Sequence, residues 1–331
     1  MELAYGPITN WEFAHVKSDP NIEMVLDQAS LYIVAQRPII TFEKLLVNPE
    51  ELVLEFEIHQ RHNPHVLKCR FPYLQDVFNI DGSNEISLAL NLIDKGKSSS
   101  NSSIRNVIGF SLVEIIDEME TRFVAWFSPE QLLYNSLRGK IDCKIDGDPR
   151  AFLRYKVHYV GRATKQGILQ RLTGHSSLQD ILSIENPLSY GDLPTHEIAI
   201  LCFRFRDNLL VQTFGLESSV DEVVEALITE KVLDQQKVFL DAEKALIKAM
   251  NPLYNKILFK DYPKSKDGLY DENYNAISYT IMDPLTLEYP DGNIEGGLTM
   301  FGGDHIFVRD NETFELVKNG GNSHITPSTG Q

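Results

Sequence analysis

KVHYVGRATKQGILQRLTGH, residues 156–175, holds four basic residues and no acidic one, in a chain of 331 residues whose formal net charge at pH 7 is -16. The wider window 150–179 contains six Lys and Arg residues and still no Asp or Glu. A local excess of positive charge on an acidic protein is a simple way to hold an anion. This segment therefore marks the place where we expect a functional site, and its pattern predicts the fold around that site.

The first half of the segment predicts a β-strand. Apolar and polar residues alternate in YKVHYVG, residues 155–161, so Tyr155, Val157 and Tyr159 are expected on one face of the strand. Gly161 is expected to end it. A tyrosine near a phosphodiester can orient or deprotonate a water molecule.

The second half predicts a short helix. GILQRLTGH, residues 167–175, places Arg171 and His175 four residues apart, so both side chains project from one helix face. The planar guanidinium of arginine is suited to phosphate oxygens, and a carboxylate from elsewhere in the chain can hold a divalent metal. A tyrosine, a cation and a metal ion together form an apparatus for phosphodiester hydrolysis.

Tyr159-Val160-Gly161, followed by Arg171 and His175, resembles the YIG motif and the next helix of the GIY-YIG nuclease family. The resemblance covers residues 155–258. In that family a buried strand follows, and EIAILCFRF, residues 197–205, is a continuous apolar run of that kind. The match lies in the order of these elements, since Tyr-Val-Gly alone has no diagnostic value.

The closing helix of the family resembles AEKALIKAMNPLYNK, residues 242–256, with Glu243, Pro252 and Asn255 in the matching places. The first motif of the family, Gly-Ile-Tyr, is expected on a strand shortly before the YVG strand. KIDGDPRAF, residues 144–152, stands there and contains no tyrosine. Two alternative counterparts of the first tyrosine remain, Tyr134 and Tyr155.

The resemblance implies a role for each candidate residue of the site. Glu243 is expected to hold Mg²⁺ (or Mn²⁺), Tyr159 to position or activate water, and Arg171 to stabilise charge on the transition state. His175 is the remaining catalytic candidate. The candidates for binding nucleic acid are Lys156, Arg162, Lys165 and Asn255.

The composition is that of a folded protein with two or three domains, since 43% of the residues are hydrophobic and 24% are charged. The 47 acidic residues against 31 basic ones exclude general coating of nucleic acid, but they allow one basic groove. The three cysteines have no CxxC spacing, which disfavours a zinc site or a disulfide framework. Signal-peptide and membrane-spanning patterns are absent from the sequence, so we expect a cytoplasmic protein without a membrane partner.

The predicted fold class is α+β with three modules. Residues 1–137 form an N-terminal β-rich α+β module, in which LVLEFEIHQ (52–60) alternates as a half-buried strand does. Residues 138–262 form a small α/β GIY-YIG-like domain, a short antiparallel sheet with helices. Residues 263–331 form a small β-rich module with a tail, and DG and GG turns punctuate it.

The predicted function is that of a metal-dependent endonuclease, a hydrolase that cuts phosphodiester bonds of nucleic acid, with DNA favoured over RNA. A restriction-like or defence-related role is compatible with it. The alternative is a domain that has lost catalysis and binds nucleic acid or another protein. The acidic flanking modules are the expected surface for a protein partner.

Overall fold

The computed structural model describes residues 1–10, 12–13, 19–82, 84–92, 104–117, 119–163, 167–173, 178, 181, 196–206, 208–211, 219–221, 224, 233–265, 267–272 and 274–320. The protein is of mixed α+β class and dominated by strands, as predicted. Within the described part of the chain, no helix is long and apolar enough to cross a membrane.

A central sheet, called sheet A, carries the YVG strand. Its strands are, in spatial order, β1 (Glu2–Leu3), β12 (His196–Arg204), β3 (Leu31–Pro38), β11 (Arg154–Arg162), β14 (Thr286–Tyr289) and β15 (Gly292–Glu295), and β2 (Ile8–Thr9) also pairs with β12. Neighbours run antiparallel except β11 and β14, which are parallel. The core strands β12 and β3 are almost continuously apolar, because both of their faces are covered.

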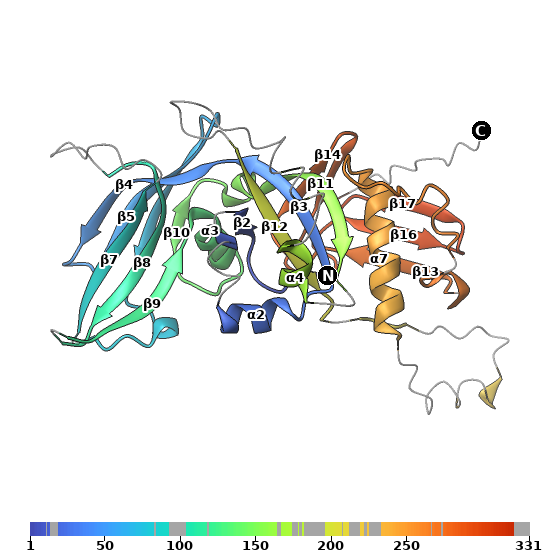
Figure 1. Cartoon of the computed structure of the whole chain (residues 1–331), viewed down its shortest axis with the longest axis horizontal. Helices are drawn as coiled ribbons and strands as arrows, with labels where there is room; N and C mark the ends of the chain where they lie inside the picture. Colours follow the sequence, from blue (N-terminus) through green and yellow to red (C-terminus); the bar gives the residue numbers. More distant parts are fainter. Residues whose placement is uncertain are drawn as a thin grey trace.

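A second sheet, called sheet B, lies beside sheet A (Figure 1). Its strands are, in spatial order, β10 (Lys144–Asp146), β6 (Val66–Pro72), β5 (Val53–Gln60), β4 (Ile40–Asn48), β8 (Val107–Ile115) and β7 (Glu85–Leu92), and β9 (Thr121–Phe127) pairs with β8. The strands pair antiparallel throughout the described part of this sheet. The predicted strand over residues 52–60 is confirmed as β5, whose buried residues alternate along its second half.

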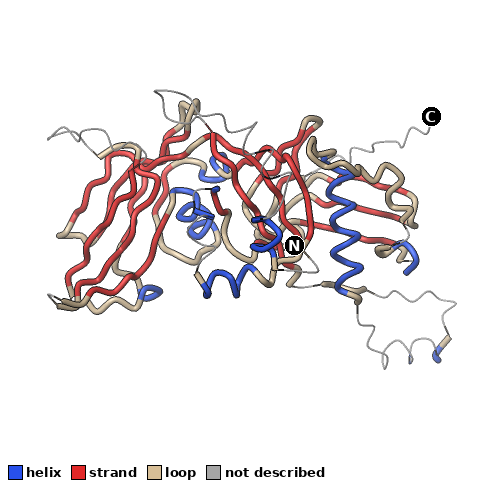
Figure 2. The backbone as a smooth tube through the Cα atoms, viewed as in Figure 1, coloured by secondary structure: helices blue, strands red, loops and turns tan. Residues whose placement is uncertain are grey.

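A third sheet, sheet C, contains β13 (Ala276–Thr280), β16 (His305–Arg309) and β17 (Thr313–Val317) in the order β13-β16-β17, and its buried residues join the same core as those of sheet B. Figure 2 shows the three groups of strands, with the longest described helix between sheets A and C. Short 3-10 helices occupy the connections at Asp76–Phe78, Pro149–Phe152 and Tyr270–Glu272.

Four α-helices are described: α2 (Pro20–Leu26), α3 (Pro129–Leu137), α4 (Ile168–Thr173) and α7 (Gln235–Met250). The hydroxyl of Ser128 accepts a hydrogen bond from the backbone N–H of Gln131 and caps α3, as its sequence predicts. Asp234 caps the start of α7, and Asn251 adopts the left-handed conformation at its end, directly before Pro252. The apolar stripes of residues 218–250 predict one long helix or two consecutive helices. Helix α7 occupies the second half of this range, and part of the first half lies outside the described residues.

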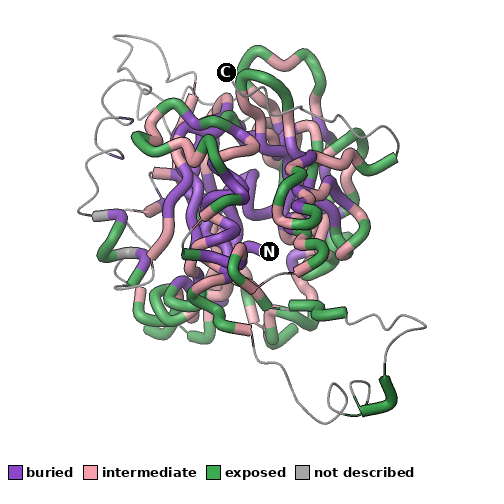
Figure 3. The backbone as a smooth tube through the Cα atoms, turned by 90° about the vertical axis from the view of Figure 1, so that its right-hand side faces the viewer, coloured by how far each residue is buried: buried purple, intermediate pink, exposed green. Residues whose placement is uncertain are grey.

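Sheet A separates two hydrophobic cores. Leu31, Ile33 and Val160 belong to the larger core, which includes residues of sheet B, α3 and α7. Tyr32 and Val34, the alternate residues of β3, belong to a smaller core with residues of α2 and α4. Helices α7 and α4 therefore cover opposite faces of sheet A, and buried backbone runs through the middle of the molecule (Figure 3).

The predicted module boundaries at residues 137 and 262 do not follow the sheets. Strand β3, from the first module, lies between β11 and β12 of the second, and β14 and β15 of the third module extend the same sheet. The larger core also contains residues of all three segments. The contiguous division was wrong because strands that are distant in sequence pair with one another, which local patterns do not encode.

Candidate functional site

Two tyrosines meet where β3 begins and β11 ends. Tyr32 pairs with Gly161 across these antiparallel strands, and the rings of Tyr32 and Tyr159 lie 5.9 Å apart, centroid to centroid, with planes tilted by 32°. The register shifts between Val157 and Tyr159. Such a β-bulge turns the following side chains to the opposite face.

Because of this bulge, and contrary to the sequence prediction, Tyr155, Val157 and Tyr159 do not share one face of the YVG strand. Tyr155 and Val157 pack into the larger core, whereas Tyr159 packs against the smaller one. The extra residue is His158, whose ring nitrogen lies 3.1 Å from the side-chain oxygen of Gln36. The prediction of strict alternation along the YVG strand was wrong, because one inserted residue reverses the face on which all following side chains of the strand lie.

Gly161 makes room for the tyrosine pair. A Cβ atom at this position would lie 2.5 Å from the ring of Tyr159 and 2.7 Å from the ring of Tyr32. Any larger residue would push the two rings apart. The glycine of the YVG motif is therefore required by close packing.

Arg171 joins the tyrosine pair from the exposed side of α4. Burial raises the pKa of Tyr32, and the charge and hydrogen bond of Arg171 oppose that rise. Burial also raises the pKa of Tyr159, against the effects of a hydrogen bond with Tyr32 and of Arg171. Both phenols therefore remain protonated near neutral pH, and each keeps a hydroxyl that can donate and accept hydrogen bonds.

Glu243 reaches the same place from α7. Its Oε2 lies 2.8 Å from Nε of Arg162, and its side chain is 14% exposed. Burial raises the pKa of Glu243, while Arg162, Lys244 and Arg171 lower it. The charge of Glu243 in turn raises the pKa of Tyr159, so the carboxylate and the tyrosine interact electrostatically. The site thus spans the end of β11, between α4 and α7 (Figure 1).

Asn255 holds β11 in position. Its Oδ1 accepts a hydrogen bond of 2.9 Å from the backbone N–H of Val160, and its Nδ2 donates one of 2.8 Å to the carbonyl of the same residue. Both ends of the amide are used on the strand. These bonds give Asn255 a structural contact, and its role in nucleic-acid binding stays a prediction.

The remaining predicted residues lie elsewhere. Lys156 is exposed at the start of β11, six residues from Arg162, which corresponds to roughly 20 Å along a strand. The length of the strand therefore separates these two candidates for nucleic-acid binding. Lys165 and His175 lie outside the described residues.

Neither alternative for the first tyrosine of the family lies in the site. The hydroxyl of Tyr134 donates to Asp283, 2.6 Å away. Tyr155 is fully buried and donates to Glu130. Tyr32 stands beside Tyr159 instead, and the sequence analysis missed it. The signal was present, since LYIVA, residues 31–35, is a continuous apolar run like that of β12.

The carboxylate of Glu243 offers one position for a divalent metal. Over the described ranges, no three or more His, Cys, Asp or Glu side chains group together in a way that could hold a metal ion. Mg²⁺ commonly binds through one or two carboxylates, water and the phosphates of a substrate. Glu243, whose Oε2 is paired with Arg162, is the carboxylate of this site that could hold such an ion.

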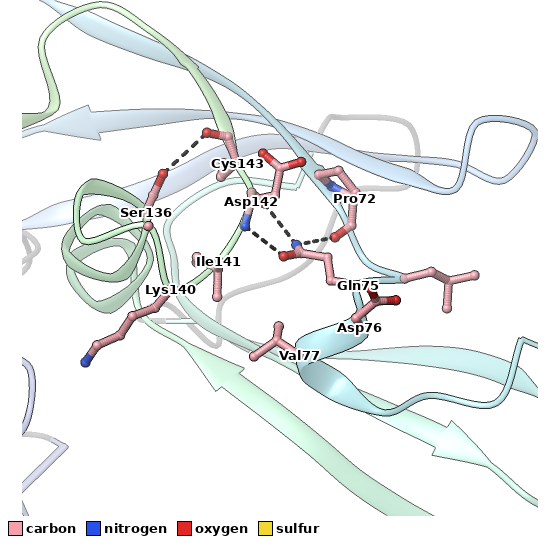
Figure 4. Close-up of a pocket in the computed structure, with 11 residues that line it drawn as sticks. Pro72, Gln75, Asp76, Val77, Ser136, Lys140, Ile141, Asp142 and Cys143 are labelled. Atoms are coloured by element: carbon pink, nitrogen blue, oxygen red, sulfur yellow. Dashed lines mark hydrogen bonds between the residues drawn. The ribbon is translucent and has the colours of Figure 1, made fainter.

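A hollow of about 670 Å³ lies away from this site, between the residues that follow β6 and the end of α3 (Figure 4). Gln75 bridges its walls, because its amide donates to Pro72 and Asp142 and accepts from the backbone of Asp142. The hollow is open, and its polar groups are used in holding two loops together.

Comparisons with protein-family models, with curated proteins and with solved structures found no match to this chain.

Proposed function

We propose that this protein is a metal-dependent endonuclease that hydrolyses phosphodiester bonds of nucleic acid, with DNA favoured over RNA. The observation that carries the proposal is the meeting of Tyr32, Tyr159, Arg171 and Glu243 at one end of sheet A. These residues come from four separate segments of the chain. Arg171 is exposed among them, so the group is open to a substrate.

Tyr32 supplies the residue that the resemblance to GIY-YIG nucleases lacked. In this proposal β12, β3 and β11 form the short antiparallel sheet of that family, with α4 and α7 as its helices. Residues 39–153, which contain sheet B, are then an insertion between the two tyrosine strands. The insertion explains why the first tyrosine was not found shortly before Tyr159.

Each residue has a task that its surroundings support. Arg171, exposed on α4, would bind a non-bridging oxygen of the scissile phosphate and stabilise the charge that develops there. Tyr159, neutral because burial raises its pKa, would orient the attacking water through its hydroxyl. Tyr32 would fix the position of Tyr159. A divalent ion bound at Glu243 would supply Lewis-acid stabilisation of the phosphate and the leaving group.

Arg162 holds Glu243 until substrate arrives. The ion pair keeps the carboxylate in place, and the neighbouring cations favour its charged form. The restriction-like role, the Mg²⁺ or Mn²⁺ requirement and a protein partner at the acidic flanks remain parts of this proposal.

The test is cleavage of labelled DNA and RNA, single- and double-stranded, by the full chain in Mg²⁺, in Mn²⁺ and in EDTA. Glu243→Gln keeps the shape of the side chain and removes its charge, so we expect the single-turnover rate to fall by about 100-fold or more. Its melting temperature without metal should change little. Glu288→Gln is the matched control, because Glu288 also pairs with an arginine, Arg154, on a strand of sheet A; it should cleave at the parental rate.

Equal cleavage by Glu243→Gln and the parent would overturn the metal assignment. Binding of nucleic acid without cleavage in any metal would favour the alternative, a domain that has lost catalysis and retained binding. Absence of both binding and cleavage would remove both proposals.

A further inference from the structure

A second group of cations lies where β12 ends, and the nuclease proposal does not use it. Arg204 and Arg206, with Gln28 and Phe205, line a hollow of about 490 Å³. Arg138, which caps α3, and Lys140 are their cationic neighbours. We call these four cations the β12-end cluster: Arg138, Lys140, Arg204 and Arg206.

Glu2 of β1 organises the cluster. Its Oε1 accepts hydrogen bonds of 3.0 and 2.8 Å from Nε and Nη2 of Arg204, and its Oε2 lies 3.4 Å from Nη2 of Arg138. Arg206 stands at 4.0 Å from the same carboxylate, and its side chain is 65% exposed. Gln28 accepts a further hydrogen bond of 2.5 Å from Arg204. Arg204 is therefore fixed, whereas Arg206 presents its guanidinium to solvent.

The cluster has more positive than negative charge. In the described part of the chain, Glu2 and Asp283 are the carboxylates that pair with these four cations. The pKa of Lys140 is lowered, by burial and by the charges of Arg138 and Arg204, although Asp283 and Glu2 oppose this. Burial is the larger cause of this lowered pKa, and the neighbouring cations add to it. An anion can approach the cluster at the exposed guanidinium of Arg206, which lines the hollow.

The β12-end cluster and the candidate site lie at the same end of the strands of sheet A. Leu31 pairs with Arg162 on one side and with Phe203 on the other. Arg162 of the site and the end of β12 are therefore two strands apart, roughly 10 Å at a strand spacing near 4.8 Å. A nucleic-acid strand covers this distance in about three nucleotides, at 3.4 Å per nucleotide along the helix axis.

A second contact connects the two places on the side of α7. The rings of Phe205 and Phe239 lie 5.1 Å apart, centroid to centroid. Phe239 and Glu243 are four residues apart on α7 and so share one helix face. Phe205, which lines the hollow, therefore contacts α7 one helix turn from Glu243.

From these observations we propose that Arg206, supported by Arg204, binds a backbone phosphate of the nucleic acid about three nucleotides from the cleaved bond. This proposal rests on the proposed function, since it names the substrate contact of the same site. Arg204 is oriented in advance by Glu2 and Gln28, which reduces the entropy lost on binding. The contact is to phosphate and so does not select a base sequence.

The experiment measures binding of a labelled 12-nucleotide DNA strand to the full chain in EDTA, across a series of salt concentrations. Arg206→Ala should weaken binding by about 3- to 10-fold at low salt and reduce the slope of log affinity against log salt by about one. Arg61→Ala is the matched control. Arg61 is exposed in the turn after β5, next to the opposite end of β3, so its removal should leave affinity and slope at parental values.

Strand length gives a second, independent readout. Dinucleotides are too short to reach from the site to Arg206, so the parent and Arg206→Ala should bind them equally. Equal effects of Arg206→Ala and Arg61→Ala on the 12-nucleotide strand would overturn the proposal. If Arg206→Ala weakened the binding of dinucleotides as much as that of the 12-nucleotide strand, the proposed spacing of about three nucleotides would be wrong. Arg206-dependent binding of inorganic phosphate, with binding of the strand unchanged, would make the hollow a free-phosphate site and overturn the proposal as well.

Failure of this proposal and failure of the nuclease proposal are distinguishable. If the chain binds the 12-nucleotide strand through Arg206 but cleaves nothing in any metal, the phosphate contact stands and the catalytic proposal falls. If cleavage depends on Glu243 while Arg206→Ala binds and cleaves as the parent does, the catalytic proposal stands and the phosphate contact at Arg206 falls.

Discussion

The two ends of strand β3 carry charged clusters of similar composition in different surroundings. Tyr32, near its start, belongs to the candidate site, where Arg171 is exposed and Arg162 is 37% exposed. Arg37, near its end, is 1% exposed and is paired with Glu130, which is fully buried. Both clusters combine tyrosine, arginine and glutamate. Only the cluster at Tyr32 is open to a substrate.

The charged groups of the cluster at Arg37 pair with one another. Nε and Nη2 of Arg37 donate hydrogen bonds of 3.0 and 2.7 Å to the two oxygens of Glu130, and Nη2 lies 2.7 Å from Glu197. Tyr155 donates to the same Glu130. Burial alone would lower the pKa of Arg37, but Glu130 and Glu197 raise it. This cluster connects β3 to α3, β11 and β12, and its contacts are structural.

The comparison of the two clusters shows what separates them. The same residue types serve structure where they are closed to solvent, and they are available for chemistry where solvent and substrate can reach them. At the Arg37 end carboxylates exceed cations, Arg37 and Glu130 are enclosed, and Glu197 is 19% exposed. At the Tyr32 end cations exceed carboxylates, and Arg171 faces solvent. Sequence patterns do not separate the two cases, because Tyr155 and Tyr159 lie four residues apart on one strand and belong to different clusters.

The largest expected effect is the loss of Arg37. Arg37→Ala leaves Glu130 and Glu197 buried without their cation, and removing one partner of a buried ion pair destabilises a protein by about 3–5 kcal/mol. The measurement is urea unfolding at pH 7. Arg162→Ala is the control, since its ion pair is partly exposed and should cost at most about 1 kcal/mol. Equal losses of stability in the two variants would contradict the distinction between the two ends.

The next largest effect is expected for the loss of Arg171, at the Tyr32 end of β3. Arg171→Ala should lower the single-turnover cleavage rate by about 10²–10³ at saturating substrate, because a cation directed at developing charge acts mainly on the transition state. Arg171→Lys should not restore the rate, since an ammonium lacks the planar fork. The unfolding free energy should change by less than about 0.5 kcal/mol, as for other exposed positions.

Two results would make Arg171 an ordinary binding residue. One is cleavage at the parental rate once Arg171→Ala is saturated with substrate. The other is full rescue by lysine. Binding titrations in Ca²⁺, an ion that often supports binding without turnover, measure affinity separately from the rate.

Local patterns predicted most of the elements, because turn residues, caps and alternation act over a few residues. The alternating segment LVLEFEIHQ, residues 52–60, forms β5, and Ser128 caps α3. The pairing of β3 with β11 depends on contacts across residues 39–153, and no local pattern encodes it. The three predicted modules failed for this reason.

The candidate site was predicted in part for the same reason. Tyr159, Arg171 and Glu243 follow one another in the order of a known motif set, and the structure brings them within electrostatic reach of one another. Their roles stay predictions. Tyr32 was missed because its place in the site exists only in the folded chain. The bulge at His158 was also missed, since one extra residue in a strand leaves no periodic signal.

The smallest expected effect is a dependence of stability on pH that arises at the Arg37 end. Burial raises the pKa of Glu12 to about 8, and the charges of Glu130 and Glu197 contribute. Burial also raises the pKa of Glu197 to about 7, although Arg37 opposes this. Both carboxyls hold a proton in the folded chain at pH values where the unfolded chain, with its ordinary pKa of 4.5, has lost it.

The sign of the effect follows from this difference. Below pH 4.5 both states are protonated at these carboxyls and the contribution to stability is complete. Between that value and about pH 8 the folded state holds more protons, so the unfolding free energy should fall as pH rises, by on the order of 1 kcal/mol per pH unit at most for each carboxyl. The measurement is thermal unfolding between pH 5 and pH 8. Glu12→Gln cannot ionise and should flatten this slope, whereas Glu50→Gln, at an exposed turn of sheet B, should keep the parental slope. A parental slope in Glu12→Gln would show that Glu12 ionises in the folded chain as it does in water, and the contrast between an enclosed and an open end of β3 would lose its electrostatic basis.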